Sequence, residues 1–576
     1  MAKNRADKNF VPDWVHEAPK PGSYRSIFKW GAPEAFKHPN RRLYKLIKET
    51  LGLTDGDFRT RLSLGNEAVR FDRKTGLTKN RIADLRRITG NENVQTDDYS
   101  RVRYAFGKTV EEAEKLRHGI VDRAADAALH PRNKEDVRKI VDYCNRHRIP
   151  VYVYGGGSSV NFGLRPSRGG MALVMSTHMN RILELNETNQ TVRVQPGIMG
   201  PEYEDALNNA PEKLGAARRY TGGHFPQSFE FSSVGGWIAA LGSGQSSSYY
   251  GDAYDLVVSQ EYVTPAGMIR TLDYPATATG PKVNDLMKGS EGSLGVLVEA
   301  CMKIYRYLPE NRRRFAFMLP TWEAAIQASR EIAQGQFGMP AVFRISDPEE
   351  TDIALKLYGI EGTALDAFMK LRGFRKMERC LFIGTAEGEM NFAANVKRRV
   401  KKICTRCGGM YITGYPVARW EEGRYTDPYM REDLQDYGIM IDTLESGVAW
   451  DNIANLHKGV RQFIKARPQT VCMAHASHFY PQGTNLYFIF IAKMKDIKEY
   501  IRFQDGIIDR ILKYGGSLSH HHGVGKMLAP WMEKHLGRSQ MNALKALKLH
   551  FDPNNIMNPG GQLGLDSGGK DWRKIK

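Results

Sequence analysis

The sequence predicts an α+β protein built from more than one domain. Its 576 residues are too many for one ordinary hydrophobic core, so two or three domains are expected. The hydrophobic content of 41% and the charged content of 26% are typical of a globular protein. Between about residues 120 and 310, short apolar strands alternate with helical patterns and with turns rich in glycine and serine.

Four segments follow one another along the chain. Residues 1–115 are polar and basic, and they predict an extension with short helices, one of which begins near Leu43. Residues 116–310 hold the regular α/β pattern, whereas residues 311–525 have fewer glycine clusters and predict a second α+β domain. Residues 526–576 predict a turn-rich C-terminal segment that returns to the 116–310 domain.

The α/β pattern begins with a helix after Asn133. Asn133 followed by Asp136 is typical of a helix start, and apolar residues recur at helical spacing until Pro150 ends the pattern. The strands and the next helix start are expected at residues 151–154, 173–175, 191–195 and Pro201.

Turns rich in glycine and serine interrupt this region at residues 155–161, 232–237, 242–248 and 289–296. Such turns expose backbone N–H groups with no side chain in the way, which suits a pyrophosphate. The Rossmann pattern GxGxxG does not follow any of the expected strands, and GxxxxGK[ST] is absent. The turns therefore favour a large phosphate-bearing cofactor held by neither of these two folds.

Three consecutive histidines, His520, His521 and His522, lie among small residues near the C-terminal end. Neighbouring residues point in different directions in a strand or a helix, so the run does not fill one core face. Glycines on both sides let the backbone bend and approach a ligand closely. The imidazoles then offer donors, acceptors or protons near neutral pH, which favours a functional role.

Cysteine usage indicates the redox compartment, and the net charge limits the classes of binding partner. The six cysteines are scattered, which suits a reducing compartment. Cys404 and Cys407 form a single CxxC, interpreted as two incidental thiols, with a zinc or redox role as the alternative. The net charge of +19 fits nucleic acid, an anionic membrane, an anionic substrate or simple solubility, but the chain has no recognised nucleic-acid motif.

The glycine-rich motifs resemble those of a known superfamily. The segment from His130 through residues 155–159 resembles the first FAD-binding motif of the vanillyl-alcohol-oxidase, or PCMH-type, flavoproteins. Residues 226–237 and 289–295 resemble its second and third motifs. Within this superfamily, about residues 29 to 558 most resemble the alkylglycerone-phosphate synthase family. The resemblance implies a two-subdomain PCMH-type FAD-binding domain, an α+β substrate (cap) domain and an N-terminal helical extension.

The resemblance also implies which residues hold FAD. We expect non-covalent FAD, because no histidine stands at the first glycine-rich loop. The family's Thr-Arg-Ala-Ser stretch is replaced by residues 240–243 and lacks its arginine, so flavin contact there can differ. The expected cofactor-binding residues are Val153, Tyr154, Gly155, Gly156, Gly157, Ser158, Ser159, Gln227, Ser228, Phe229, Glu230, Phe231, Ser232, Ser233, Gly235, Gly236, Ala240, Ser243, Glu291, Gly292, Ser293, Leu294, Gly295, Val296 and Leu297.

The family's site residues have counterparts in this sequence. Its essential tyrosine corresponds to Tyr487, its substrate-contacting arginine to Arg431, and the arginine near its flavin to Arg344. Its three consecutive histidines correspond to residues 520–522. In that family the flavin N5 attacks the substrate carbon, the acyl group leaves as a fatty acid, and a fatty alcohol adds. An arginine fork suits an anionic substrate, and a phenol beside histidines suits proton transfer.

Without the resemblance, these residues have simpler interpretations. Tyr487 lies in an apolar stretch and would be a core tyrosine, and Arg344 and Arg431 would be surface or salt-bridged arginines. His475 and His478 are candidate metal ligands, but no carboxylate or cysteine has a suitable spacing, so no metal is expected.

Two enzyme functions remain open. One is synthase-like chemistry on an anionic, lipid-derived or small-molecule substrate, with peripheral contact to an anionic membrane. The other is FAD-linked oxidation of a D-2-hydroxy acid or an alcohol, although residues 475–487 and 521–525 depart from the motifs of the lactate-type relatives. A nucleic-acid-binding protein would explain the charge but not the glycine turns, so no nucleic acid is expected.

The expected setting is a homodimer in the cytoplasm, either free or peripheral on a membrane. The N-terminal residues are basic but no apolar signal region follows them. Residues 574–576 do not form a Ser-Lys-Leu address. No apolar run approaches the length of a membrane-spanning helix.

Overall fold

The structure is a computed structural model that describes residues 10–566. The terminal residues on which the targeting expectations rest, 1–5 and 574–576, lie outside this range. The described chain forms two compact units. Unit 1 comprises residues 10–20, 29–66 and 311–517, and unit 2 comprises residues 21–28, 67–310 and 518–566. Both units mix helices and sheets, which confirms the predicted α+β class.

Unit 2 contains two main sheets. The four-stranded sheet has the order β1-β2-β4-β3, and the five-stranded sheet has the order β5-β6-β10-β8-β9. The strands of the first sheet are β1 (Val94–Gln95), β2 (Ala127–Leu129), β3 (Val151–Tyr154) and β4 (Met171–Val174). Those of the second are β5 (Ile182–Asn186), β6 (Thr191–Val194), β8 (Val257–Thr264), β9 (Gly267–Arg270) and β10 (Val296–Lys303). A third, two-stranded sheet joins β7 (Tyr220–Thr221) to β11 (Tyr305–Arg306).

The helix predicted after Asn133 is α6 (Lys134–His147). The Asn133 side chain accepts the N–H of Asp136, which satisfies a donor that the first turn leaves unpaired. The buried face of α6 packs in the main core of unit 2, together with strands β3 and β4. Strand β3 runs parallel to β4 and then enters the first glycine-rich turn. The predicted strands at residues 151–154, 173–175 and 191–195 correspond to β3, β4 and β6.

The remaining helices of unit 2 are mostly short. The helix predicted near Pro201 is α7. Helices α1, α4 and α5 share a small core of their own, formed by Tyr24, Phe28, Val102 and Leu116 among others. The helices are α1 (Tyr24–Phe28), α3 (Lys79–Thr89), α4 (Asp98–Arg103), α5 (Val110–Arg117), α7 (Gly200–Asn208), α8 (Ala210–Leu214), α9 (Val234–Ala240), α10 (Ser247–Tyr250), α11 (Ala253–Leu256), α12 (Val283–Met287), α21 (Met532–Leu536) and α22 (Arg538–Phe551).

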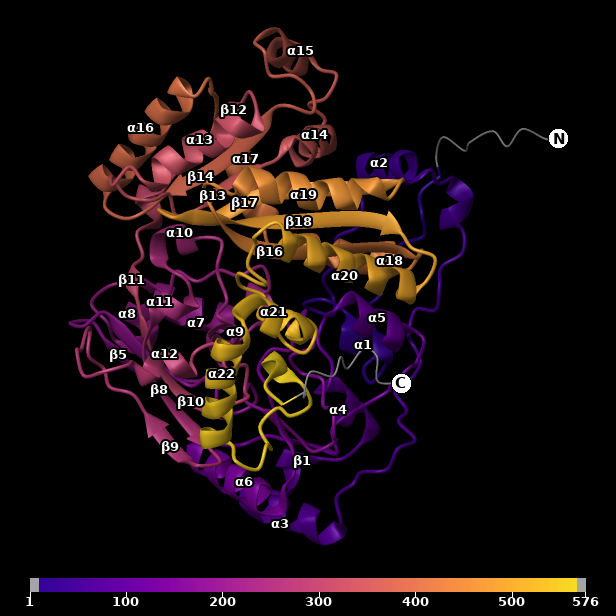
Figure 1. Cartoon of the computed structure of the whole chain (residues 1–576), viewed down its shortest axis with the longest axis vertical. Helices are drawn as coiled ribbons and strands as arrows, with labels where there is room; N and C mark the ends of the chain where they lie inside the picture. Colours follow the sequence, from indigo (N-terminus) through magenta and orange to yellow (C-terminus); the bar gives the residue numbers. More distant parts are fainter. Residues whose placement is uncertain (1–9, 567–576) are drawn as a thin grey trace, which may run out of the picture. The chain divides into compact units, whose positions relative to one another are not determined.

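Unit 1 is built on one seven-stranded antiparallel sheet of order β15-β12-β14-β13-β17-β18-β16. Its long hairpin of β17 and β18 is drawn in orange in Figure 1. The strands are β12 (Arg313–Leu319), β13 (Phe343–Ser346), β14 (Cys380–Ala386), β15 (Met410–Thr413), β16 (Ile439–Ala449), β17 (Thr470–Tyr480) and β18 (Gly483–Lys493).

Helices cover the sheet of unit 1. Met318 on β12 packs with Leu355 and Met369 of two neighbouring helices, while the rings of Phe317 and Phe382 meet 5.9 Å apart. Helices α19 and α20 pack on each other and on the β16–β18 part of the sheet (Figure 1). The helices are α2 (Arg41–Leu51), α13 (Trp322–Ala333), α14 (Pro348–Leu357), α15 (Ala364–Leu371), α16 (Met390–Arg406), α17 (Tyr415–Gly423), α18 (Met430–Gln435), α19 (Ile453–Ala466) and α20 (Ile497–Lys513).

The N-terminal extension contributes to both units. The helix predicted near Leu43 is α2, whose apolar face packs on Val471 and Ile491 of the seven-stranded sheet. Residues 21–28 and 67–115 of this extension instead belong to unit 2. Within residues 10–566, none of the helices combines the length and the apolar character that crossing a bilayer requires.

Candidate functional site

The first and second glycine-rich segments pack directly against each other in unit 2. A Cβ atom on Gly155 would overlap the Ser233 hydroxyl, and one on Gly156 would overlap the carbonyl oxygen of Phe231. Only glycine therefore allows this close approach of two backbones. The sequence predicted that both segments bind the same cofactor, and the fold brings them together.

The third segment joins them. The N–H groups of Gly289 and Glu291 donate to the carbonyl oxygens of Ile238 and Ala239, both at 3.0 Å, at the end of α9. A Cβ atom on Gly292 would lie 3.6 Å from Val153 of β3. All three predicted FAD segments thus converge on the end of β3 and on α9. The result is a cradle of backbone groups and small side chains, which suits a pyrophosphate-bearing cofactor.

Hydroxyl groups fix the shape of this cradle. Ser233 caps α9 and accepts the N–H of Gly236 at 3.2 Å. The indole N–H of Trp237 donates to the Ser232 hydroxyl at 2.7 Å. The Ser293 hydroxyl donates to the carbonyl oxygen of Ser290 at 2.5 Å. The segments therefore have a defined geometry without depending on long side chains.

The other predicted cofactor residues lie in or beside these segments. Gln227 and Ser228 precede the short helical turn at Phe229–Phe231, and Ala240 ends α9. Ser243 donates a hydrogen bond to Asp252. Leu294 and Gly295 lead into β10, which begins with Val296 and Leu297. Their roles toward the flavin stay predictions.

His224 is a buried residue in this region that the sequence analysis missed. It is 1% exposed, and neither ring nitrogen has a hydrogen-bond partner within residues 10–566. Its ring lies 4.7 Å from that of Trp237. Burial lowers the pKa of His224 to about 4, so its neutral ring offers one donor and one acceptor. Buried polar atoms of this kind are expected to meet a partner, and a polar group of the cofactor would fit.

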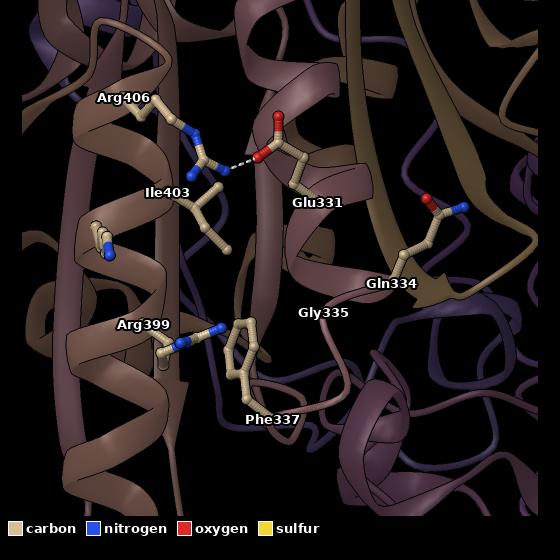
Figure 2. A pocket seen from close by; sticks show the side chains of 8 residues that line it. Glu331, Gln334, Gly335, Phe337, Arg399, Ile403 and Arg406 are labelled. Atoms are coloured by element: carbon tan, nitrogen blue, oxygen red, sulfur yellow. Dashed lines mark hydrogen bonds and ion pairs between the residues drawn. The ribbon is translucent and has the colours of Figure 1, made fainter.

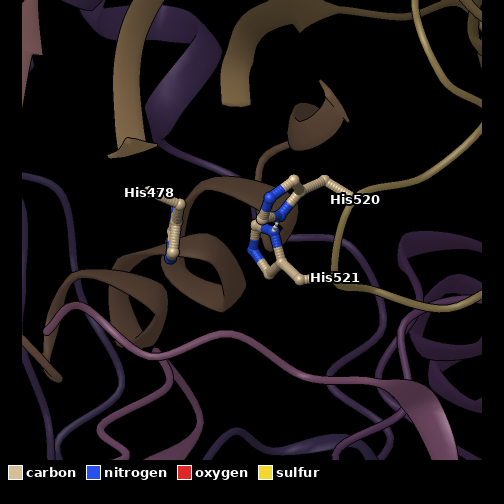
Figure 3. Close-up of side chains that lie close together, drawn as sticks. All are labelled: His478, His520 and His521. Atoms are coloured by element: carbon tan, nitrogen blue, oxygen red, sulfur yellow. Dashed lines mark hydrogen bonds between the residues drawn. The ribbon is translucent and has the colours of Figure 1, made fainter. Parts of the chain in front are cut away.

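The three histidines lie in a loop of unit 2 and contact one another. The Nδ1 atoms of His520 and His521 are 3.0 Å apart, and Figure 3 shows their rings side by side. At this distance one Nδ1 donates and the other accepts, so the two rings differ in tautomer or charge. The rings of His521 and His522 meet edge to face with centroids 4.7 Å apart. The pair His520–His521 can therefore hold one shared proton.

In unit 1, the predicted Tyr487 and Arg344 lie on one face of the seven-stranded sheet. Tyr487 on β18 is directly opposite His475 on β17, and His475 is opposite Ser346 on β13. Arg344 is two residues before Ser346 and so points to the same face. On the other side of Tyr487, its partner on β16 is Glu445. Four neighbouring strands thus contribute polar groups to one row.

Tyr487 is held tightly in this row. Its ring stacks on His475 with centroids 4.9 Å apart and an interplanar angle of 17°. Its hydroxyl donates to Oγ1 of Thr443 at 2.9 Å. Burial raises the pKa of Tyr487 well above its ordinary value. The phenol therefore stays protonated near neutral pH and acts as a donor rather than as a base.

Glu350 of α14 balances the charge of Arg344. The carboxylate accepts a hydrogen bond from the Arg344 guanidinium, and its other oxygen lies 3.2 Å from Nδ1 of His475. Burial opposes ionisation of Glu350, but its contacts with His475 and with the positively charged Arg344 outweigh burial and hold the pKa of Glu350 at about 2. Glu350 is a member of this cluster that the sequence analysis missed, because nothing in the spacing of α14 links it to β13 or β17.

His475 is neutral in this setting. Burial, followed by the positive charge of Arg344, lowers the pKa of His475. Nδ1 of His475 lies 3.2 Å from both Nη2 of Arg344 and a carboxylate oxygen of Glu350, so it accepts from the guanidinium in one tautomer and donates to the carboxylate in the other. A metal at Nδ1 would have to displace the guanidinium, so the contacts of His475 do not favour the alternative of a metal ligand.

Arg431 lies on α18 of unit 1. It is 9% exposed, and its guanidinium carbon is 5.4 Å from the centre of the Trp30 ring. Its charge also acts on the half-buried Asp442, which accepts hydrogen bonds from Tyr500 at 2.6 Å and Gln504 at 2.9 Å. A buried guanidinium beside an aromatic ring offers a rigid fork for an anion. Its role toward a substrate stays a prediction.

Two domain families match the chain. The family described as FAD binding domain matches residues 125–273, and the family described as FAD linked oxidases, C-terminal domain, matches residues 308–561. Alkyldihydroxyacetonephosphate synthase of Dictyostelium discoideum is 32% identical over 498 residues, which cover 83% of this chain and 80% of that protein. The chain belongs to the alkyldihydroxyacetonephosphate synthase family. The predicted family membership is confirmed.

A solved structure agrees with this assignment, and a more distant relative has a different name. A structure of alkyldihydroxyacetonephosphate synthase is 28% identical and has a TM-score of 0.79, covering 93% of this chain and 99% of that one. Glycolate oxidase subunit GlcD of Bacillus subtilis is 26% identical and covers 85% of this chain and 98% of that protein. The match to the FAD binding domain family and the likeness to the synthase show that the chain is a FAD-dependent enzyme, as the sequence predicted.

Proposed function

We propose that this chain is an alkyldihydroxyacetonephosphate synthase. It would replace the acyloxy group of an acyl-dihydroxyacetone phosphate by the alkoxy group of a fatty alcohol and release the fatty acid. The exchange is balanced without an external oxidant or reductant, because one carboxylate leaves and one alcohol enters. The observation that carries the proposal is the sheet face on which a protonated Tyr487, a neutral His475 and the Arg344 guanidinium lie together.

Each of the predicted site groups suits one task in the exchange. Bound FAD supplies a nucleophilic ring nitrogen for the reaction. Tyr487 would donate a proton or a hydrogen bond to a substrate oxygen, since its pKa keeps the phenol protonated. Arg344 would stabilise negative charge that develops on the substrate, and Arg431 would bind the phosphate. The pair His520–His521 would accept and return the proton of the entering alcohol.

The second candidate is FAD-linked dehydrogenation of a D-2-hydroxy acid or an alcohol. Relatives that include a glycolate oxidase subunit support it, and the two arginines would suit a carboxylate as well as a phosphate. However, the synthase of Dictyostelium discoideum is 32% identical to this chain, whereas the glycolate oxidase subunit is 26% identical. Residues 475–487 and 521–525 also depart from the motifs of the lactate-type relatives. These differences support the synthase function over the dehydrogenase.

One anaerobic experiment separates the two. The purified holoenzyme would be mixed with acyl-dihydroxyacetone phosphate and a long-chain alcohol, or with a panel of 2-hydroxy acids, while flavin absorbance and fatty-acid release are followed. Fatty-acid release without net reduction of the flavin supports the synthase. Stoichiometric bleaching by a hydroxy acid, reversed by an external electron acceptor, would overturn it in favour of the dehydrogenase.

We also propose that unit 1 contacts an anionic membrane through helix α16. The helix carries Lys397, Arg398, Arg399, Lys401, Lys402 and Arg406 and no acidic residue. Figure 2 shows the pocket beside it, where Arg399 lies 5.2 Å from the centre of the Phe337 ring and Arg406 pairs with Glu331. A basic face on an amphipathic helix is attracted to anionic lipid by about 1 kcal/mol for each cation near the surface.

Vesicle co-sedimentation tests this contact. Arg398→Glu with Lys402→Glu should reduce binding to vesicles that contain phosphatidylserine, with neutral phosphatidylcholine vesicles as the baseline. The matched control is Lys79→Glu with Arg86→Glu, which changes the net charge equally on exposed positions of α3. Equal loss of binding in both pairs would mean that net charge alone acts, and α16 would be excluded as the docking surface. The homodimer and the cytoplasmic location stay predictions.

A further inference from the structure

A buried carboxylate holds the turn that follows the three histidines. Oε1 of Glu291 accepts the N–H of Val524 at 2.6 Å, and Oε2 accepts the N–H of Gly525 at 2.8 Å. The side-chain amide of Gln562 donates to Oε2 as well. Burial raises the pKa of Glu291 to about 7, although these donors act in the opposite direction. Both carboxylate oxygens are thus engaged by the chain itself.

Asn161 holds the same turn from the first glycine-rich segment. Its side-chain amide donates to the carbonyl oxygen of His522 at 2.7 Å, and its own amide oxygen accepts the Ser159 hydroxyl at 2.8 Å. Its backbone carbonyl accepts the N–H of Met527 at 3.1 Å. The turn is therefore bonded at both ends to residues next to a predicted flavin segment.

Two glycines make room for these contacts. Gly523 has a φ of +79°, and a Cβ atom there would lie 2.5 Å from Oε1 of Glu291. Gly525 has a φ of +57°, and a Cβ atom there would overlap the carbonyl oxygen of Asn161. The local sequence and its two polar partners fit each other closely, which a turn serving only as a connection does not need.

We propose that Glu291 and Asn161 are positioning residues for the three histidines. They fasten the histidine turn to the third and first flavin segments, so that ordering of those segments also sets the place of the imidazoles. Glu291 acts on the turn rather than mainly on the cofactor. The effect on turnover rests on the proposed function, whereas the fastening of the turn does not.

Glu291→Gln tests the proposal in the holoenzyme. The new amide group faces N–H donors, so at least one of the bonds to Val524 and Gly525 is lost. We expect backbone amide exchange in residues 518–527 to rise about tenfold and turnover to fall about tenfold, while the bound flavin per chain stays unchanged. The exchange is measured by mass spectrometry and does not depend on which substrate the enzyme uses.

A double variant that swaps the two side chains tests whether the histidine turn can be restored. Glu291→Gln combined with Gln562→Glu restores one carboxylate and one amide at the same place, so amide exchange in residues 518–527 should return part of the way to wild type. A merely structural role would not predict recovery of the turn by a change at Gln562. If Glu291→Gln instead loses flavin in proportion to turnover and leaves amide exchange unchanged, the proposal is wrong and Glu291 is a cofactor contact.

A pair of glycine variants separates crowding from backbone strain. Gly523→Ala and the control Gly537→Ala have nearly the same φ, +79° and +81°, but only at Gly523 does a Cβ atom meet Glu291. Gly523→Ala should therefore loosen the turn by amide exchange, whereas Gly537→Ala should not change residues 518–527. Equal exchange in the two variants would overturn the proposed fastening. These outcomes can be interpreted even if the synthase assay fails, because amide exchange is measured without substrate.

Discussion

The glycine-rich cradle of unit 2 and the polar sheet face of unit 1 are built in opposite ways. The cradle is assembled from consecutive residues, such as Gly155 and Gly156, whose lack of side chains lets backbones meet. The sheet face is assembled from long side chains on separate strands, and Arg344 and His475 are 131 positions apart. The cradle depends on the absence of side chains, whereas the sheet face depends on charged groups and a hydroxyl at fixed positions.

This difference predicts which changes each region tolerates. Added volume should damage the cradle and its hold on the flavin, because no space remains between the segments. The sheet face should tolerate changes of similar volume structurally but lose chemistry when a hydroxyl or a charge is removed. Flavin content and turnover are therefore expected to respond separately in the two units.

The largest effect is expected for Tyr487→Phe in unit 1. This change removes the hydroxyl but keeps the ring that stacks on His475, so flavin content should stay at the wild-type level. Turnover should fall by about 10²–10⁴-fold, the usual contribution of a positioned proton donor. The matched control is Tyr411→Phe on β15 of the same sheet. Unchanged turnover in Tyr487→Phe would remove this phenol from the mechanism.

The sequence predicted the cradle in detail because its information is local. Strand β3, the glycines that follow it and the cap of α6 by Asn133 all depend on residues close together in the chain. The resemblance to known flavoproteins extended this to three segments, and the fold brings them together. Local turn chemistry and family motifs were therefore enough to predict most of the glycine-rich cradle in unit 2.

The sheet face was predicted only in part. Tyr487 and Arg344 came from the resemblance, but Glu350 and the stacking of His475 depend on strand order and register, which pattern alone does not fix. His224 was missed because a single histidine beside glycines has no distinctive spacing. The role of Glu291 toward the cofactor stays a prediction, but the bonds of its carboxylate to the histidine turn were missed, because they join residues far apart in the sequence.

In unit 2, Gly156→Ala should reduce flavin content more than turnover per bound flavin. The added methyl group would overlap the carbonyl oxygen of Phe231, which forces the first and second segments apart. We expect a loss of about 1–3 kcal/mol in stability, together with weaker FAD binding measured by fluorescence titration. Gly76→Ala is the matched control, since its Cβ atom would come no closer than 3.4 Å to Asp126. Full flavin affinity in Gly156→Ala would contradict the close packing of the two segments.

The smallest effect is expected for Glu350→Gln, for which the stability of the folded chain is measured as a function of pH. The pKa of Glu350 is lowered from 4.5 to about 2 in the folded chain, so its stabilising effect is full above pH 4.5. That effect is lost as the pH falls through the folded value, about 2. Wild type should therefore exceed Glu350→Gln by about 1–2 kcal/mol near neutral pH, and the gap in urea midpoint should shrink on acidification.

The control for this prediction is Glu331→Gln, whose partner Arg406 is 60% exposed. An exposed pair contributes at most about 1 kcal/mol, because water screens it. A gap for Glu350→Gln that stays constant or widens toward low pH would mean that the carboxylate is not ionised beside Arg344. In that case the sheet face would carry a net positive charge, and Arg344 would be able to bind an anionic substrate without first separating from Glu350.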